Sequence, residues 1–155
     1  MEFDRYREAV AANRRKHGFD VVDGGDDDFD RIWSANEDDP TVGSVSLFAT
    51  VVNANDADPE DVIATADRFR EVLADLTDGT SAATPIGYVV FAVDSAHDDL
   101  VSAATSYTVA ERRSNVFPLV YDLESETLHT HPVPRLKGRG IYQRQSEDAE
   151  RFFDV

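Results

Sequence analysis

The stretch GYVVFAV, residues 87–93, is apolar on both faces of the strand that it predicts. A strand that is covered on both faces lies in the middle of a sheet, between layers of helices. Asp94 and Ser95 follow it and are residues that cap helices, and a helix is predicted from about Ala96 to Arg113. Val116–Asp122 is predicted to be the next strand. Strand, helix and strand together predict a βαβ unit with a right-handed crossover.

The segments before this unit predict one helix, three strands and a second helix. In the second helix Asp58 is a good N-cap and Pro59 suits the first helical position. Its apolar residues then recur at spacings of three and four and form one stripe, which consists of Val62, Ala66, Phe69, Leu73 and Leu76. The earlier elements are predicted at residues 1–17 (helix), 19–22, 29–35 and 44–52 (strands), with a polar loop at 36–43.

After the βαβ unit, a turn at residues 124–126 leads into a short strand at 127–131, which completes a hairpin. The segment 135–155 is polar, with a short helix predicted at 146–153. The predicted fold class is therefore α/β, with α+β as the alternative. It is a single-domain mixed sheet spanning 1–155, with helices packed on its faces in the order α-β-β-β-α-β-α-β-β.

Composition limits the classes of protein that this chain can belong to. It has 155 residues, 41% of them hydrophobic, and no cysteine, which excludes disulfides, thiolate metal sites and thiol nucleophiles. The first twenty residues contain no apolar segment of the signal-peptide type, and no apolar run approaches the roughly 18 residues that a membrane span needs. We expect a cytoplasmic protein without membrane contact. The sequence leaves its oligomeric state open.

The charge is strongly unbalanced. Thirty-one acidic residues face fifteen basic ones, which gives a formal charge of -16, and only Lys16 and Lys137 are lysines. Such a load repels itself in dilute buffer, whereas molar salt shortens the screening length to about 3 Å. The composition resembles that of proteins from extremely halophilic archaea. We therefore expect a protein of a salt-rich cytoplasm.

An acidic run that contains Asp28 and Asp30 is a candidate site for a divalent cation such as magnesium. The order helix-strand-strand-strand-helix-strand is also similar to the core of restriction-endonuclease-like nucleases. That resemblance implies an acid on the second strand, for which Asp28 or Asp30 qualifies, and a Glu-x-Lys motif on the third. The third strand, 44–50, contains neither an acid nor a lysine. The resemblance therefore implies a degenerate nuclease domain, and the alternative for the acidic run is a solvated turn.

Polar residues follow two of the predicted strands. Asn53 and Asn55 end the third strand, and Asp94, Ser95 and His97 follow the buried one. The carboxyl edge of a parallel sheet is the usual ligand crevice of α/β proteins, so these residues form a candidate ligand edge if the two strands are parallel neighbours. His97 would be its general base. The alternative is that Asp94 or Ser95 only caps the helix and that His97 is exposed.

Two histidines, His129 and His131, share a face of the last predicted strand. No third metal ligand lies near them in the sequence, so we expect both at the surface.

A basic segment stands out in this acidic chain. It comprises Arg112, Arg113, Arg135, Lys137, Arg139 and Arg144. The guanidinium group of arginine binds phosphates and carboxylates through paired N–H donors, even where salt weakens ordinary ion pairs. The first five of these residues are therefore the candidate partner-binding site. Nucleic acid is disfavoured by the net charge and by the loss of counterion release at high salt. The alternative is that these bases pair with the protein's own carboxylates.

These observations lead to three hypotheses about function. The first is a non-catalytic interaction or regulatory domain that binds a protein partner or an anionic ligand through its basic segment and needs no cofactor. The second is a metal-dependent phosphodiesterase or degenerate nuclease, which would use Mg²⁺. The third is a sensor of a small ligand or nucleotide at the candidate ligand edge.

Overall fold

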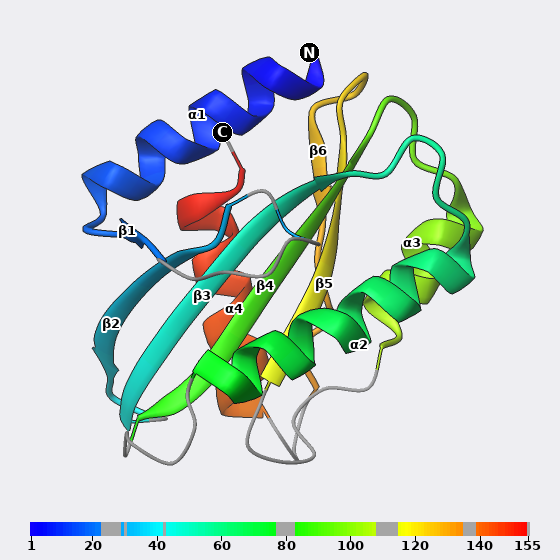
Figure 1. The fold of residues 1–155 in the computed structure, drawn as a ribbon. Helices are drawn as coiled ribbons and strands as arrows, with labels where there is room; N and C mark the ends of the chain where they lie inside the picture. Colours follow the sequence, from blue (N-terminus) through cyan, green and yellow to red (C-terminus); the bar gives the residue numbers. More distant parts are fainter. Residues whose placement is uncertain are drawn as a thin grey trace.

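The computed structural model describes residues 1–22, 29, 31–41, 43–76, 83–107, 115–134 and 139–154. Within these residues, four helices and six strands follow one another along the chain (Figure 1). In order, they are α1 (Phe3–Lys16), β1 (Asp20–Val21), β2 (Trp33–Asp39), β3 (Gly43–Asn53), α2 (Pro59–Leu76), β4 (Thr84–Val93), α3 (Asp98–Thr105), β5 (Asn115–Asp122), β6 (Thr127–His129) and α4 (Arg139–Phe152).

The strands lie in the sheet in the same order as in the sequence, from β1 to β6. Strands β3, β4 and β5 are parallel neighbours, with Val51 opposite Val90 and Val90 opposite Leu119. Strands β1 and β2 precede them, and β6 follows, in antiparallel pairings. Helices α2 and α3 connect the parallel strands, as the sequence predicts. The predicted class, a mixed α/β sheet with helices on its faces, is confirmed.

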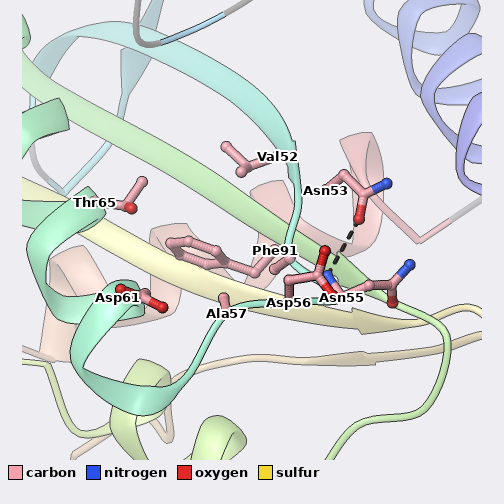
Figure 2. Close-up of a pocket in the computed structure, with 9 residues that line it drawn as sticks. Val52, Asn53, Asn55, Asp56, Ala57, Asp61, Thr65 and Phe91 are labelled. Atoms are coloured by element: carbon pink, nitrogen blue, oxygen red, sulfur yellow. Dashed lines mark hydrogen bonds between the residues drawn. The ribbon is translucent and has the colours of Figure 1, made fainter.

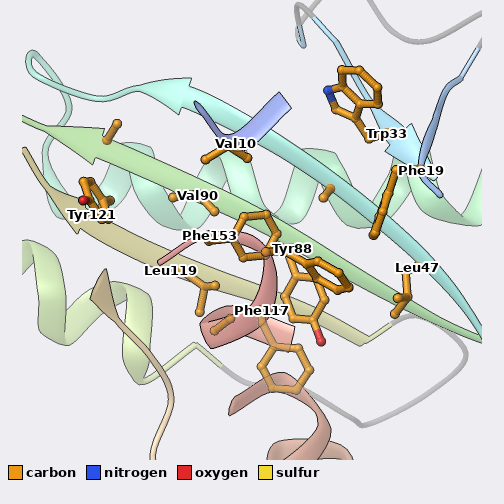
Figure 3. Close-up of a cluster of buried hydrophobic side chains, with 14 of the residues drawn as sticks. Val10, Phe19, Trp33, Leu47, Tyr88, Val90, Phe117, Leu119, Tyr121 and Phe153 are labelled. Carbon is orange, nitrogen blue, oxygen red and sulfur yellow. The ribbon is translucent and has the colours of Figure 1, made fainter. Parts of the chain in front are cut away.

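Each face of the sheet has its own hydrophobic core. Tyr6 and Val10 of α1 and Phe152 of α4 pack with alternate residues of β3, β4 and β5 on one face (Figures 1 and 3). Phe69 of α2 and Leu100 of α3 pack with the intervening residues on the other face. Strand β4 is therefore buried on both sides, because helices cover it from both directions.

Helix α2 follows its sequence signals closely. The Asp61 backbone N–H donates to Oδ1 of Asp58 at 2.9 Å, and the Asp58 N–H donates to Oδ2 of Asp61 at 3.0 Å, which is a reciprocal cap. Phe69 and Leu73 are completely buried. They lie so close to Gly87 that a Cβ added there would come within 2.7 Å of Leu73 Cδ2. A glycine at this point of β4 therefore allows the helix to pack directly on the sheet.

The predicted bounds of β2 are wrong. The strand begins at Trp33 and continues to Asp39, through the segment that the sequence predicts as a loop. Asn36 accepts a hydrogen bond from the Ser46 hydroxyl at 2.9 Å, and Asp38 accepts one from Ser44 at 3.0 Å. Polar side chains therefore pair across β2 and β3, so the strand continues without an apolar pattern.

Two helices also differ from their predictions. Helix α3 begins after His97, so neither Asp94 nor Ser95 is its N-cap, and residues 108–113 of the predicted helix lie outside the described part of the chain. Helix α4 is longer than predicted, and with Phe152 and Phe153 it contributes two fully buried rings. The segment predicted to be polar is thus part of the core. In the described residues, no helix combines the length and apolar character needed to span a bilayer.

Candidate functional site

The carboxyl ends of β3 and β4 lie side by side, as the sequence predicts for parallel neighbours. Oδ1 of Asn55 accepts a hydrogen bond of 2.7 Å from the Asp94 backbone N–H. Oδ1 of Asn53 accepts one of 3.2 Å from the Asn55 N–H (Figure 2). Asp122, at the end of β5, accepts one of 3.0 Å from the Ala96 N–H. These polar groups hold the loops at the edge of the sheet together.

Two hollows, of about 450 and 350 Å³, lie at this edge, and Figure 2 shows the first of them. Asp56 and Asp61 are the charged residues that line the first among the described residues. Ser95 and His97 line the second, together with Asp99, and His97 is exposed. An anionic ligand such as a nucleotide would meet mainly carboxylates here. The geometry of the edge therefore suits the anchoring of loops better than the binding of an anion.

The other predicted sites mostly fall outside the described residues. This holds for the metal candidates Asp28 and Asp30 and for Arg112, Arg113, Arg135 and Lys137, while Arg139 is described only as the first residue of α4. Strand β3 contains no acid and no lysine at its observed bounds. In the part of the chain that the structure describes, no three histidine, aspartate or glutamate side chains are grouped as metal ligands would be.

Two basic residues prove to be buried rather than exposed. Arg144 donates from Nε to Asp148 at 2.8 Å and from Nη2 to Glu37 at 2.6 Å, so it pairs with the protein's own carboxylates. His131 is only 2% exposed, and its Nε2–H donates to the carbonyl oxygen of Pro118 at 3.0 Å. The expectation that His131 lies at the surface is wrong. Helix α4 covers it, with Gln145 hydrogen-bonded to its backbone.

A larger pocket, of about 680 Å³, lies between α1 and the first strands of the sheet. We call it the arginine pocket. Its walls come from three places in the sequence: α1, the residues that lead into β2, and the end of β3. The described residues that line it include Arg7, Glu8, Arg14, Arg15, Arg31 and Trp33. Four guanidinium groups thus gather in one hollow of a chain whose net charge is -16.

Trp33 is the centre of this arrangement. The guanidinium carbons of Arg14, Arg15 and Arg31 lie 6.0, 5.6 and 5.8 Å from the centroid of its ring. Because all three guanidinium carbons lie within 6.0 Å of the same centroid, any two of them are separated by at most twice that distance. Trp33 is 5% exposed and lies at the border of the hydrophobic core (Figure 3). Within the described residues, no carboxylate forms an ion pair with any of the three arginines.

Arg14 is the most unusual of the lining residues. It is 1% exposed, and among the described residues no acceptor lies within hydrogen-bonding distance of its Nε or Nη2. Its guanidinium carbon lies 5.1 Å from the ring of Phe153, and a desolvated cation–π contact contributes about 2 kcal/mol. An unpaired buried ion costs several kcal/mol, so this contact does not offset the loss of hydration. Burial accordingly lowers the pKa of Arg14 to about 9, against an opposing effect of Tyr6.

The sequence contained one signal for this pocket. Phe3, Tyr6 and Val10 mark the inward stripe of α1, and Arg14 continues that stripe four residues after Val10. Cations at the C-terminal end of a helix also interact favourably with its dipole, and that interaction does not require burial, so the stripe alone did not predict a buried arginine. Arg31 and Trp33 carried no corresponding signal, because only the folded sheet places them beneath α1.

In comparisons with known proteins, no family model matched the chain, and no match was found among curated proteins or solved structures.

Proposed function

We propose that this protein is a non-catalytic binding domain that takes up a small anionic ligand in the arginine pocket. The observation that carries the proposal is Arg14, a buried guanidinium with two unpaired donors in the wall of a hollow. Nε and Nη2 form one edge of the guanidinium group, the fork that binds carboxylates and phosphates in a bidentate manner. An anion within reach of this fork would supply the acceptors that Arg14 lacks.

The local charge supports the same function. Among the described lining residues, Arg14, Arg15 and Arg31 face one carboxylate, that of Glu8, while Arg7 is paired with Asp4 outside the lining. This basic lining belongs to a protein with twice as many acidic as basic residues. Like charges gathered in one hollow repel each other, and a bound anion relieves that repulsion. Binding is thus favoured both by the contacts of the anion and by the release of this cost.

The chemistry of the lining favours binding over catalysis. Guanidinium groups of ordinary pKa stay protonated at physiological pH, so they hold and neutralise anions but exchange no protons there. The third hypothesis, a small-ligand sensor, also requires a binding pocket. It placed the ligand at the candidate ligand edge, whereas the present proposal places it in the arginine pocket. Within the basic segment, residues 135–139 stay a second predicted contact for a partner. Substitutions there test this contact separately from the arginine pocket.

Thermal unfolding in the presence of inorganic phosphate tests the proposal. An anion at about 100 times its dissociation constant adds about 2.7 kcal/mol to stability. For a chain of this size, that corresponds to a rise of about 5–10 °C in Tm. R31Q should remove about half of the rise, because tenfold weaker binding at the same anion concentration lowers the added stability to about 1.4 kcal/mol. Arg31 is exposed, so its loss leaves the core intact. R5Q is the matched control, since Arg5 lies exposed on α1 and does not line the pocket.

A further variant distinguishes the two candidate sites. R135Q/K137Q/R139Q removes three charges from the basic segment and leaves the arginine pocket untouched. We expect it to keep the full phosphate-induced rise in Tm. A rise that is lost in this variant and retained in R31Q would assign the anion to the basic segment instead. The absence of any rise in the wild-type protein would reject anion binding altogether.

A further inference from the structure

We infer that the group recognised in the arginine pocket is a compact dianion of the phosphate-monoester type, carried by a small molecule; this inference rests on the binding function proposed above. The first argument is charge balance. Among the described lining residues, the guanidinium groups of Arg14, Arg15 and Arg31 face the carboxylate of Glu8, while Arg7 is paired with Asp4. A monoanion leaves part of that excess positive charge uncompensated. A dianion balances more of it within the same volume.

The second argument is the convergence of donors. Arg14, Arg15 and Arg31 surround one ring, with guanidinium carbons 5.6 to 6.0 Å from its centroid. Each guanidinium offers a planar fork of N–H donors, and a phosphate monoester has three terminal oxygens pointing in different directions. Several arginines can therefore bind one such group at the same time. A phosphodiester offers only two terminal oxygens and one charge.

The third argument concerns the rest of the ligand. Trp33 is 5% exposed and has three guanidinium groups around its ring, so it presents no open face on which a nucleobase could stack. The pocket, at about 680 Å³, falls in the range of small-molecule sites and is larger than a phosphate group alone requires. Ala11, Ala12 and Val51 provide its apolar wall. These features favour a phosphorylated small molecule over a nucleic-acid backbone.

Calorimetric titration with methyl phosphate and dimethyl phosphate tests this inference. At pH 8 methyl phosphate is a dianion, because the second pKa of a phosphate monoester is about 6. Dimethyl phosphate is a monoanion of similar size and represents the nucleic-acid backbone. In about 2 M KCl the screening length is below about 3 Å, so direct contacts dominate. We expect the wild-type protein to bind methyl phosphate at least about tenfold more tightly than dimethyl phosphate.

The variants assign the preference to named residues. R31Q and R15Q should each weaken methyl phosphate binding by about tenfold and reduce the preference for the monoester, because each removes one fork. R5Q should retain both. Circular dichroism of each variant checks that the fold is intact, and R15Q replaces R31Q if the latter changes the spectrum.

The outcomes separate this inference from the proposed function. Equal affinity for the two anions, lost in R31Q and R15Q, would overturn the preference for a dianion while leaving an anion site in the arginine pocket. If the protein binds neither anion, both the dianion preference and the anion site in the arginine pocket are overturned. Both are also overturned if R31Q and R15Q bind the anions as tightly as the wild type does.

Discussion

The Tyr88 hydroxyl donates a 2.6 Å hydrogen bond to Oδ2 of Asp148, and this contact joins the middle of β4 to α4 inside the protein. The same carboxylate oxygen accepts a hydrogen bond from Arg144 Nε at 2.8 Å. Arg144 and Arg151 in turn both reach Glu37 on β2, at 2.6 and 2.7 Å. One network, buried at Tyr88 and Asp148, therefore fixes α4 against two strands. Burial raises the pKa of Tyr88 well above its ordinary value, so the phenol stays a donor.

Replacing Asp148 tests this network. Asp148 is 1% exposed, and D148N removes its charge and replaces one of the two acceptor oxygens that bind Arg144 and Arg151 with a donor amide. Breaking a buried ion pair from one side costs about 3–5 kcal/mol. Y88F is the control, because it removes one hydrogen bond and should cost about 1–1.5 kcal/mol. Urea denaturation measures both. A loss for D148N no larger than that for Y88F would show that the network does not hold α4 in place.

For Arg14 we predict the opposite effect, because its replacement should not lower the stability of the protein. R14M keeps most of the side-chain volume and removes a buried charge that has no acceptor in the described residues. We expect its free energy of unfolding to equal or exceed that of the wild type in the absence of ligand, because the desolvation cost disappears. The variant should no longer bind phosphate. A destabilisation of about 2 kcal/mol or more would instead indicate that Arg14 serves packing and cation–π contacts alone.

His131 predicts a loss of stability in acid. Burial lowers its pKa in the folded protein to about 4, against a hydrogen bond to Pro118 that opposes the shift, whereas the unfolded value is about 6.5. Between these values the unfolded state binds more protons, so stability falls as the pH drops through this window. From pH 7.5 to 4.5, His131 should contribute a loss of about 2–3 kcal/mol.

The comparison variant is H131F, which keeps a ring against Phe117 and cannot titrate. Over the same pH range, the free energy of unfolding of H131F should fall by about 2–3 kcal/mol less than that of the wild type. Parallel pH profiles for the two proteins would show that His131 titrates normally and that its burial has no energetic consequence.

Phe69 predicts a large cavity effect. Its side chain is completely buried and contacts Phe29 edge to face, with ring centroids 5.1 Å apart. F69A should reduce the free energy of unfolding by about 3–5 kcal/mol. Ile63, on the same helix, is 43% exposed, so I63A serves as the control and should cost far less. Similar losses for both variants would contradict the observed packing face of α2.

The net charge of -16 predicts that stability depends on salt. The Tm should rise between about 0.1 M and 2 M KCl, because the screening length falls from about 10 Å to less than 3 Å. Most of the rise should occur below about 1 M, where screening changes most. An unchanged Tm would argue against adaptation of this protein to high salt.

Much of the fold follows from the sequence alone. The apolar run at 87–93 predicts the central strand, and the stripe from Val62 to Leu73 predicts the face that α2 buries. Gly18 adopts φ +83°, as its place after the last turn of α1 requires. These features depend on periodicity and on local backbone chemistry. Neighbouring residues determine both, so no knowledge of distant contacts is needed.

The tertiary structure alone decided the features that depend on charged residues. Glu37 and Arg144 are 107 positions apart in the sequence, and only the packing of α4 on β2 makes them partners. The polar end of β2 and the start of α4 were therefore predicted wrongly, because a charged residue without a visible partner is expected in water. The arginine pocket was missed for the same reason. Periodicity indicates which face of an element is buried, but the residue that a buried charge meets is set by the folded chain.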